Sequence, residues 1–221
     1  MSDQKTAIIT FAGHEMLLDA GRALYWPAHG LLIVSDLHFG KGTFLSRHGS
    51  PLPIHDTYDT LQRLSAVIAR YQPQRVIALG DSFHDLRAYQ SLTRQDRHDL
   101  HALIAGVSQW DWVLGNHDPQ IEDDLPGDFH KVIEQDGVLF SHERDDSSVP
   151  QVIGHFHPKA MMRIGGRRVC GPSFMISQHL LIMPAFGSYT GGLDCADPAI
   201  AELMDDTPEC RFIYNDKIWK L

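Results

Sequence analysis

The run Leu31-Leu-Ile-Val-Ser-Asp-Leu-His38 places four apolar residues directly before a serine and an Asp-x-His pair. A short apolar run of this kind is typical of a strand that is buried on both faces, as in sheets covered by helices. In such sheets the ligand-binding side chains follow the carboxyl ends of the strands. The run therefore predicts an α/β fold with Asp36 and His38 at its functional edge.

Four more apolar stretches end in the same way. They are Val76–Leu79 before Gly80-Asp81, Trp112–Leu114 before Gly115-Asn-His-Asp118, Val138–Phe140 before Ser141-His142, and Val152-Ile153 before Gly154-His-Phe-His157. Because strand ends gather at one edge of an α/β sheet, these carboxylate, imidazole and amide groups are expected to meet in one place.

The remaining pattern predicts two packed mixed β-sheets flanked by helices. The first half reads as strands over 7–11, 14–19 and 23–26, with helices over 56–71 and 88–105. The second half reads as strands joined by short turns, over 131–134, 138–142, 152–155, 160–164, 168–170 and 174–184. A short helix over 198–204 and a closing hairpin of 212–214 with 218–221 complete the chain. With no repeat or linker, residues 1–221 are expected to form a single domain.

Composition indicates an ordinary soluble protein. Of 221 residues, 43% are apolar and 21% charged, and no apolar run reaches the roughly 18–20 residues that cross a bilayer. The first residues show no basic region followed by an apolar stretch, so we expect no secretory signal. Cys170, Cys195 and Cys210 form no C-x-x-C pair, so we expect reduced thiols and a cytoplasmic location.

The formal net charge of −9 argues against a protein that coats DNA, whose affinity comes from lysine and arginine. Bound cations at Asp36 and Asp81 would reverse this sign locally. The chain contains 14 histidines, and histidine is the commonest metal ligand.

The residue types suit a centre with two metal ions. Asp81 is the candidate to bridge the ions through its two oxygens, and Asn116 offers a neutral oxygen. The histidine nitrogens suit Mn, Fe or Zn better than Mg alone. Two carboxylates against two divalent ions leave a net charge of about +2, which attracts phosphate and stabilises charge on its oxygens.

This ordered set of motifs resembles the calcineurin-like metallophosphoesterase superfamily, whose pattern is D-x-H, G-D, G-N-H-[D/E], H and G-H-x-H. The resemblance covers residues 35–157. It implies a metallophosphoesterase-type sandwich and two divalent ions, with manganese preferred and iron or zinc as alternatives. It assigns to the first ion Asp36, His38, Asp81 and His157, and to the second ion Asp81, Asn116, His142 and His155.

The resemblance also implies catalytic roles for two neighbouring residues. His117 is similar to the family's non-ligand histidine, which contacts the transferring phosphoryl group or protonates the leaving alkoxide. Asp118 would orient its imidazole. The chemistry implied is in-line attack on phosphorus by a hydroxide that bridges the two ions.

A narrower resemblance is to the bacterial DNA-ligase-associated metallophosphoesterase family, described as a DNA-damage-response endonuclease encoded beside a ligase and a helicase. It is carried by Ser35-Asp-Leu-His-Phe-Gly-Lys41, Arg47-His-Gly-Ser-Pro-Leu-Pro53, Gly80-Asp-Ser-Phe-His84 and Pro184-Ala-Phe-Gly-Ser-Tyr-Thr-Gly-Gly192. It implies a DNA substrate, a role in DNA repair, and association with a ligase and a helicase. Asp85 stands where that family has a serine, which leaves the metal motifs intact.

Four residues are candidates for substrate binding, each with a plainer alternative. Lys41 could meet a phosphate or be a solvated loop lysine, and His84 could support the site or lie at the surface. Arg47 could join Lys159, Arg163, Arg167 and Arg168 in a basic rim for nucleic acid, or these residues could simply be exposed. Tyr189 could stack on a base or belong to a tight glycine-rich loop.

Two other functions compete with a nuclease. Hydrolysis of a small phosphoester, such as a nucleotide-linked pyrophosphate, a cyclic nucleotide or a phosphomonoester, needs the same metal centre, and the acidic balance of the chain favours it slightly. A non-catalytic scaffold is disfavoured, because every expected ligand and His117 are retained.

Overall fold

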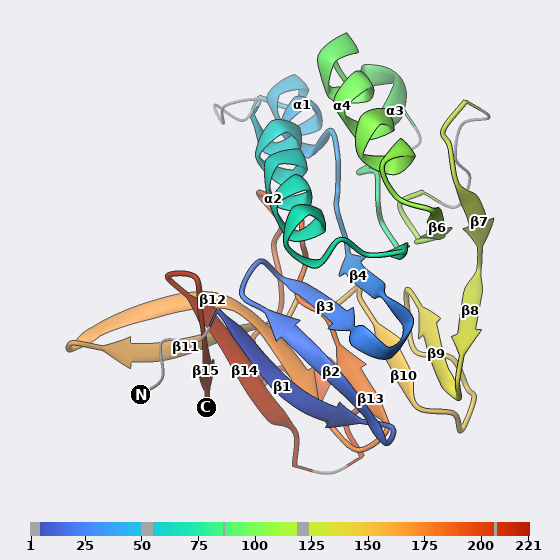
Figure 1. Cartoon of the computed structure of the whole chain (residues 1–221). Helices are drawn as coiled ribbons and strands as arrows, with labels where there is room; N and C mark the ends of the chain where they lie inside the picture. The colour runs from blue at the N-terminus through green and yellow to red at the C-terminus, as the bar shows by residue number, and fades with distance from the viewer. Residues whose placement is uncertain (1–4, 50–54, 86, 119–123, 206) are drawn as a thin grey trace.

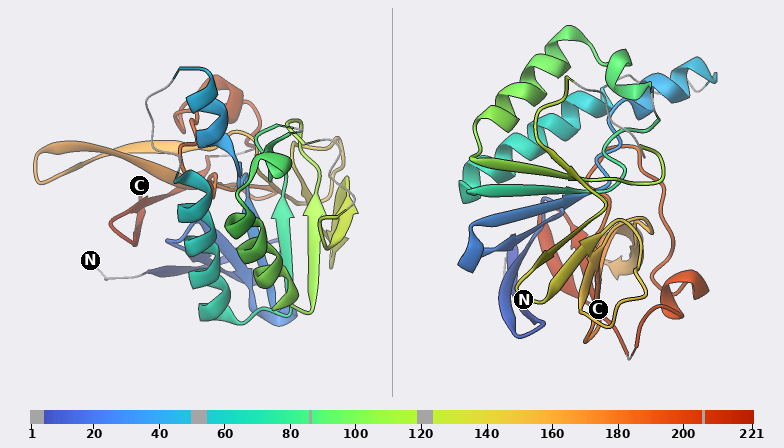
Figure 2. Two further views of the ribbon diagram at one scale, coloured as in Figure 1. Left: turned by 90° about the horizontal axis from the view of Figure 1, so that it is seen from above. Right: turned by 90° about the vertical axis from the view of Figure 1, so that its right-hand side faces the viewer.

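The computed structural model describes residues 5–49, 55–85, 87–118, 124–205 and 207–221. Two β-sheets pack face to face in it (Figures 1 and 2). The seven-stranded sheet runs in the order β1-β2-β3-β4-β5-β6-β7, antiparallel from β1 to β4 and parallel from β4 to β7. Its strands are β1 Thr6–Phe11, β2 His14–Asp19, β3 Ala23–Trp26, β4 Leu31–Ser35, β5 Arg75–Leu79, β6 Gln109–Val113 and β7 Asp128–His130.

The eight-stranded sheet runs in the order β15-β14-β12-β13-β10-β9-β8, and β11 pairs with β12 beyond this path. Strands β9, β10 and β13 are parallel, so the sheet is mixed. The β11–β12 hairpin projects from the body of the molecule (Figures 1 and 2). The strands are β8 Val132–Gln135, β9 Val138–Ser141, β10 Gln151–Ile153, β11 Lys159–Ile164, β12 Arg167–Ile176, β13 Leu180–Ile182, β14 Glu209–Tyr214 and β15 Lys217–Lys220.

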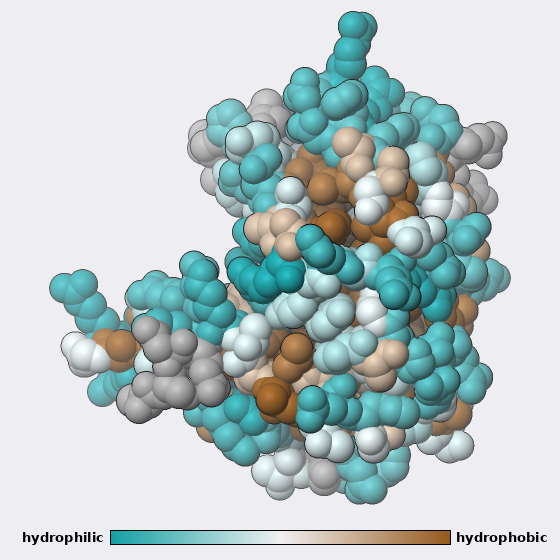
Figure 3. All heavy atoms as spheres, viewed as in Figure 1, coloured by the Kyte–Doolittle hydropathy of each residue, from teal (hydrophilic) through white to brown (hydrophobic). Residues whose placement is uncertain are grey.

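Helices cover the outer face of the seven-stranded sheet (Figure 2). They are α1 Lys41–Arg47, α2 Asp56–Tyr71, α3 Ala88–Ser91 and α4 Arg94–Ala105, while the short α5 Pro198–Ala201 packs on the other sheet and a 3-10 turn spans Pro27–His29. None of the described helices is long and apolar enough to span a membrane. The face seen in Figure 3 is covered mainly by hydrophilic residues.

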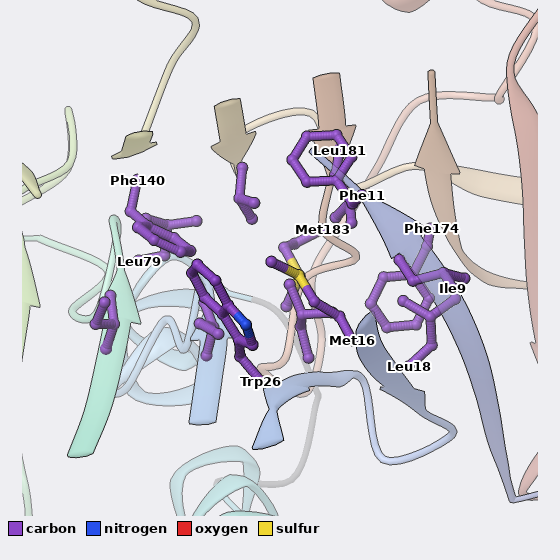
Figure 4. Packing of buried hydrophobic residues seen from close by; sticks show 14 of the residues in the cluster. Ile9, Phe11, Met16, Leu18, Trp26, Leu79, Phe140, Phe174, Leu181 and Met183 are labelled. Carbon is purple, nitrogen blue, oxygen red and sulfur yellow. The ribbon is translucent and has the colours of Figure 1, made fainter. Parts of the chain in front are cut away.

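The core has two main layers, one on each face of the seven-stranded sheet, and a smaller cluster where α5 packs on the other sheet. Leu31 and Ile33 of β4 face the second sheet, and apolar side chains of both sheets, such as Trp26 of β3 and Phe140 of β9, interdigitate between them (Figure 4). The alternate β4 residues, Leu32 and Val34, face the helices. All four are completely buried, as the apolar run predicts for a strand covered on both faces. This burial fixes where β4 ends and therefore where Asp36 begins its loop.

The predicted fold class, two mixed sheets flanked by helices, is confirmed. The single helix predicted over 88–105 is wrong. Leu92 and Thr93 interrupt it, because the Thr93 side chain accepts a hydrogen bond from Asp96 N and starts α4 as a new helix. The strand predicted over 174–184 is two strands, β12 and β13, joined by a turn.

Other boundaries also differ from the prediction. Gly171 and Pro172 do not break β12, because both residues pair with residues of β11. Strand β7 and helix α1 were not predicted at all. Residues 50–53, part of the Arg47–Pro53 phrase, lie outside the described residues.

Candidate metal centre

Loops that follow five strands carry all seven expected ligands. Asp36 and His38 follow β4, Asp81 follows β5 and Asn116 follows β6, all in the seven-stranded sheet. The other sheet contributes three histidines, one after β9 and two after β10: His142, His155 and His157. Side chains from both sheets come into contact beyond these strand ends.

One set of ligand atoms gathers around Asp36 and His157. The Nε2 atom of His157 lies 3.1 Å from Asp36 Oδ1 and 3.4 Å from His38 Nε2. His38 Nε2 is in turn 3.9 Å from Asp81 Oδ2. Asp36, His38 and His157 thus offer three ligand atoms that could hold one ion.

A second set gathers around His142. Its Nε2 atom lies 2.8 Å from Asn116 Oδ1, 3.2 Å from His155 Nδ1 and 3.4 Å from Asp81 Oδ2. His155 Nδ1 is also 3.2 Å from Asn116 Oδ1. Asp81 Oδ2 approaches both sets, so this carboxylate is placed to be shared between two ions.

These spacings fit transition-metal coordination. Ligands held about 2.0–2.2 Å from an ion lie roughly 3.0–3.5 Å from one another in tetrahedral or octahedral geometry. In two histidine pairs, His38 with His157 and His142 with His155, ring nitrogens face each other at 3.4 and 3.2 Å. A cation shared by both lone pairs, or a proton donated from one ring nitrogen to the other, would satisfy each pair. Carboxylate, amide and imidazole donors together suit Mn, Fe or Zn.

The buried carboxylates remain charged. Burial alone would raise the pKa of Asp36, but the neighbouring His157, His142 and His38 outweigh it and hold this pKa below its ordinary value. Asp81 behaves in the same way, since its hydrogen bond and charge interaction with His142 overcome the effect of burial on its pKa. Burial lowers the pKa of His38 to about 3. Ionised carboxylates and a neutral imidazole are the states that bind metal.

Five of the seven expected ligands adopt the left-handed backbone region. Their φ angles are 53° for Asp36, 46° for His38, 39° for Asp81, 67° for His155 and 48° for His157. Non-glycine residues rarely adopt this region. Each such residue costs on the order of 1–3 kcal/mol, and such strain clusters at functional sites.

Three glycines of the motifs, Gly80, Gly115 and Gly154, leave the space that the ligands fill. A Cβ atom on Gly154 would lie 2.0 Å from Ser35 Oγ and 2.3 Å from Asp36 Oδ2. A Cβ atom on Gly80, whose φ is +69°, would lie 1.9 Å from His142 Nδ1. The Gly-Asp and Gly-His-x-His spacings therefore follow from close packing of backbone against ligand side chains.

His117 lies beside both sets, but Asp118 does not orient it as expected. The Nδ1 atom of His117 is 2.9 Å from His84 O, and its Nε2 atom is 3.9 Å from Asp81 Oδ2. The buried Asp118 carboxylate instead accepts hydrogen bonds from Phe83 N at 2.9 Å and Gly115 N at 3.0 Å. The loop after β6 turns the Asp118 side chain into the interior. The backbone carbonyl of His84 therefore takes the position from which the His117 ring is oriented. Burial raises the pKa of Asp118 to about 7.

The candidate substrate-binding residues lie at different distances from the centre. His84 stacks on His117 with ring centroids 5.3 Å apart, and Lys41 is half-buried at the start of α1. Arg47 is exposed at the far end of α1, roughly 9 Å along the axis. Tyr189 is 37% exposed and has a φ of 59°.

Two residues near the ligands were not predicted from the sequence. Ser35 Oγ donates to Asp36 Oδ2, and Glu143 Oε1 lies 3.7 Å from His155 Nδ1. Both adjoin a ligand in the chain, which is the signal that could have found them.

No protein-family model matches this sequence, and no curated protein matches it. Among solved structures, the crystal structure of Pseudomonas putida nuclease MPE is similar, with a TM-score of 0.75 and 24% identity over 98% of this chain and 100% of that one. The structure of YfcE, a phosphoesterase from E. coli, matches with a TM-score of 0.40 and 14% identity, over 86% of this chain and 97% of that one. The first likeness shows a shared fold, in agreement with the fold that the motif resemblance implies.

Gly154→Ala is expected to weaken metal binding at least about tenfold, because the new methyl group displaces Ser35 or the Asp36 carboxylate. Elemental analysis after loading with Mn²⁺ measures this. Gly106→Ala is the matched control, since its Cβ would meet the nearest atom at 3.4 Å. Metal content equal to that of the wild type in Gly154→Ala would contradict the packing argument.

Asp118→Asn is expected to lower the free energy of unfolding by about 1–3 kcal/mol, because an amide cannot accept from both backbone N–H groups. Urea unfolding measures this, with the exposed Asp128→Asn as control. A variant with unchanged stability and reduced turnover would show that Asp118 acts through His117 after all.

Proposed function

We propose that this chain is a dinuclear-metal-dependent phosphodiesterase that cleaves nucleic acid, with DNA as its substrate. The observation that carries the proposal is the convergence of carboxylate, amide and imidazole groups from both sheets into two sets that share Asp81. The fold, which is similar to that of a nuclease, supports it. The sequence motifs support it independently.

The donor atoms suggest how the ions would be held. Asp36, His38, Asp81 and His157 would hold the first ion, and Asp81, Asn116, His142 and His155 the second. We propose manganese, with iron or zinc as alternatives, because the set mixes nitrogen and oxygen ligands. When bound, two such cations lower the pKa of a water molecule and neutralise charge on the phosphate oxygens.

His117 is proposed to assist the leaving group. With Nδ1 against His84 O, its tautomer carries a proton at Nδ1 when neutral and leaves Nε2 facing the centre. Protonated at Nε2, the ring could contact the phosphoryl group or give a proton to the departing alkoxide. The stacked His84 ring limits how far His117 can rotate.

Lys41 is a cation next to the centre. It begins α1 directly after the loop that carries His38, and its charge interacts with Asp81 and Asp36. Burial lowers its pKa. We propose that Lys41 meets a phosphate oxygen as a point charge. A role in DNA repair beside a ligase and a helicase is proposed from the sequence resemblance, and a cytoplasmic location from the pattern of the cysteines.

Purified protein is expected to cleave DNA in the presence of Mn²⁺ and to stop when the metal is chelated. Electrophoresis of single-stranded and duplex DNA measures this. Failure to cleave either DNA, together with rapid hydrolysis of an aryl phosphodiester or phosphomonoester, would instead support the small-phosphoester alternative.

His117→Asn is expected to retain its metal but lose roughly 10²–10⁴-fold in turnover, the range of lost acid–base assistance. Metal analysis and steady-state kinetics are measured on the same sample. His98→Asn, whose side chain is 75% exposed on α4, is the control. Loss of metal from His117→Asn would mean that His117 is a ligand.

A further inference from the structure

One cavity adjoins the metal centre on the His157 side, and a second cavity shares four of its lining residues. The metal-side cavity, about 420 Å³, is lined by His157, Lys159, Arg22 and the loop that carries Tyr189. The distal cavity, about 430 Å³, lies between α2, the β2–β3 turn and the β14–β15 turn. The residues that line both are Arg22, Cys170, Gly171 and Pro172. Either volume lies in the range of small-ligand sites.

Cations outnumber acidic residues in the lining of both cavities, although the chain is acidic overall. Arg22 and Lys159 line the metal-side cavity, and three further cations line the distal one, Lys5, Arg63 and Arg70. The acidic residues of the distal cavity are Asp19 and Asp216. Asp19 is already engaged by the Arg70 guanidinium and by Tyr71, whose hydroxyl donates to it at 2.6 Å.

Arg22 lines both cavities and has unused hydrogen-bond donors. Its Nη1 atom donates to Ala185 O at 3.3 Å and to Gly187 O at 3.0 Å. Within the described part of the chain, its Nε and Nη2 atoms have no hydrogen-bond partner and no carboxylate pairs with it. Burial and the neighbouring Arg63 lower the pKa of Arg22 to about 10, which leaves it charged near neutral pH.

The hydrogen bonds to Ala185 O and Gly187 O do not by themselves explain why an arginine stands at position 22. Arg63 already binds the same loop, because it donates to Phe186 O and lies over the Phe186 ring at 5.5 Å. Arg22 is only partly buried, so its free N–H groups are accessible to an anion that enters the cavity. A guanidinium with a free edge suits phosphate, which it can bind through two hydrogen bonds.

Arg22 and Lys159 are both linked to the metal centre through neighbouring backbone. Gly187 accepts from Arg22 through its carbonyl oxygen, and its N–H donates to Asp36 O at 3.0 Å. Lys159, whose Nζ donates to Thr190 O at 2.9 Å, is two residues from His157. An anion bound here could therefore be covalently joined to a phosphate at the metals.

We propose that Arg22 and Lys159 form a subsite for a second phosphate of the substrate, the one next to the scissile phosphate along a nucleic-acid strand. This inference rests on the proposed function. Tyr189 lines the same cavity with an exposed ring, where the base between the two phosphates can stack. The strand then runs from the centre toward Arg63 and Lys5 in the distal cavity.

A thymidine dinucleotide provides the test. Hydrolysis of TpT, pTpT and TpTp is compared in Mn²⁺ for the wild-type protein, Arg22→Gln, Arg22→Lys and Lys159→Gln, with Arg94→Gln as control. Arg94 is exposed and lines neither cavity. One of the two terminal phosphates is expected to raise kcat/KM about tenfold to a hundredfold in the wild type and in Arg94→Gln, the range of a charged hydrogen bond.

The gain from that terminal phosphate is expected to fall to less than about threefold in Arg22→Gln and Lys159→Gln, and to survive partly in Arg22→Lys. A gain that persists in both glutamine variants, or no gain in a wild type that cleaves TpT, overturns the subsite. A wild type that hydrolyses none of the three compounds, nor longer DNA, overturns the proposed function instead. If Arg22→Gln does not fold, Lys159→Gln alone decides the question.

Discussion

The carboxylate of Asp36 joins the two sheets, and the site depends on this contact. Asp36 follows β4 of one sheet, and its Oδ2 atom accepts a hydrogen bond at 3.1 Å from His155 N, which follows β10 of the other. Its Oδ1 atom lies 3.1 Å from His157 Nε2. The Asp36 carbonyl also accepts from Gly187 N. One completely buried residue thus sets the distance between the loops that carry the ligands.

Burying this carboxylate imposes conditions on its surroundings. A charged group in the interior must be hydrogen-bonded and paired, and here the pairing falls to three histidines. The same requirement explains the glycine at 154, which lets the β10 loop approach Asp36 closely enough for its backbone to donate. Local backbone strain in the loops is then balanced by contacts that only this arrangement provides.

The sequence predicts the ends of strands well where a buried apolar run stops at a polar residue. Strands β2 and β3 and helix α2 have the predicted bounds, and the ligands follow β4, β5 and β6 as expected. The pattern fails where local signals compete with tertiary contacts. Thr93 caps a new helix inside an apparent single one, and Gly171-Pro172 stay in a strand because β11 supplies their partner.

The candidate site, too, could be predicted only in part from the sequence. Residue types and spacing indicate which side chains gather, because strand ends meet at one edge. They do not indicate which way a loop residue turns, so the contacts of Asp118 with Phe83 N and Gly115 N were not foreseen. The position of Arg22 beside the candidate site could not be predicted either, because Arg22 lies in a turn that is far along the chain from every ligand motif except the first. Only the packing of the 184–187 loop against that turn connects them.

The pairing of β10 has a consequence for the order in which the molecule assembles. The last expected ligand, His157, is followed by the strands that complete its sheet, and β10 is held between β9 and β13. During synthesis a chain that has emerged only as far as His157 therefore has all its ligand side chains but lacks one neighbour of the strand that positions two of them. Because domains generally fold as units, the centre matures only after residues 180–182 have joined the sheet.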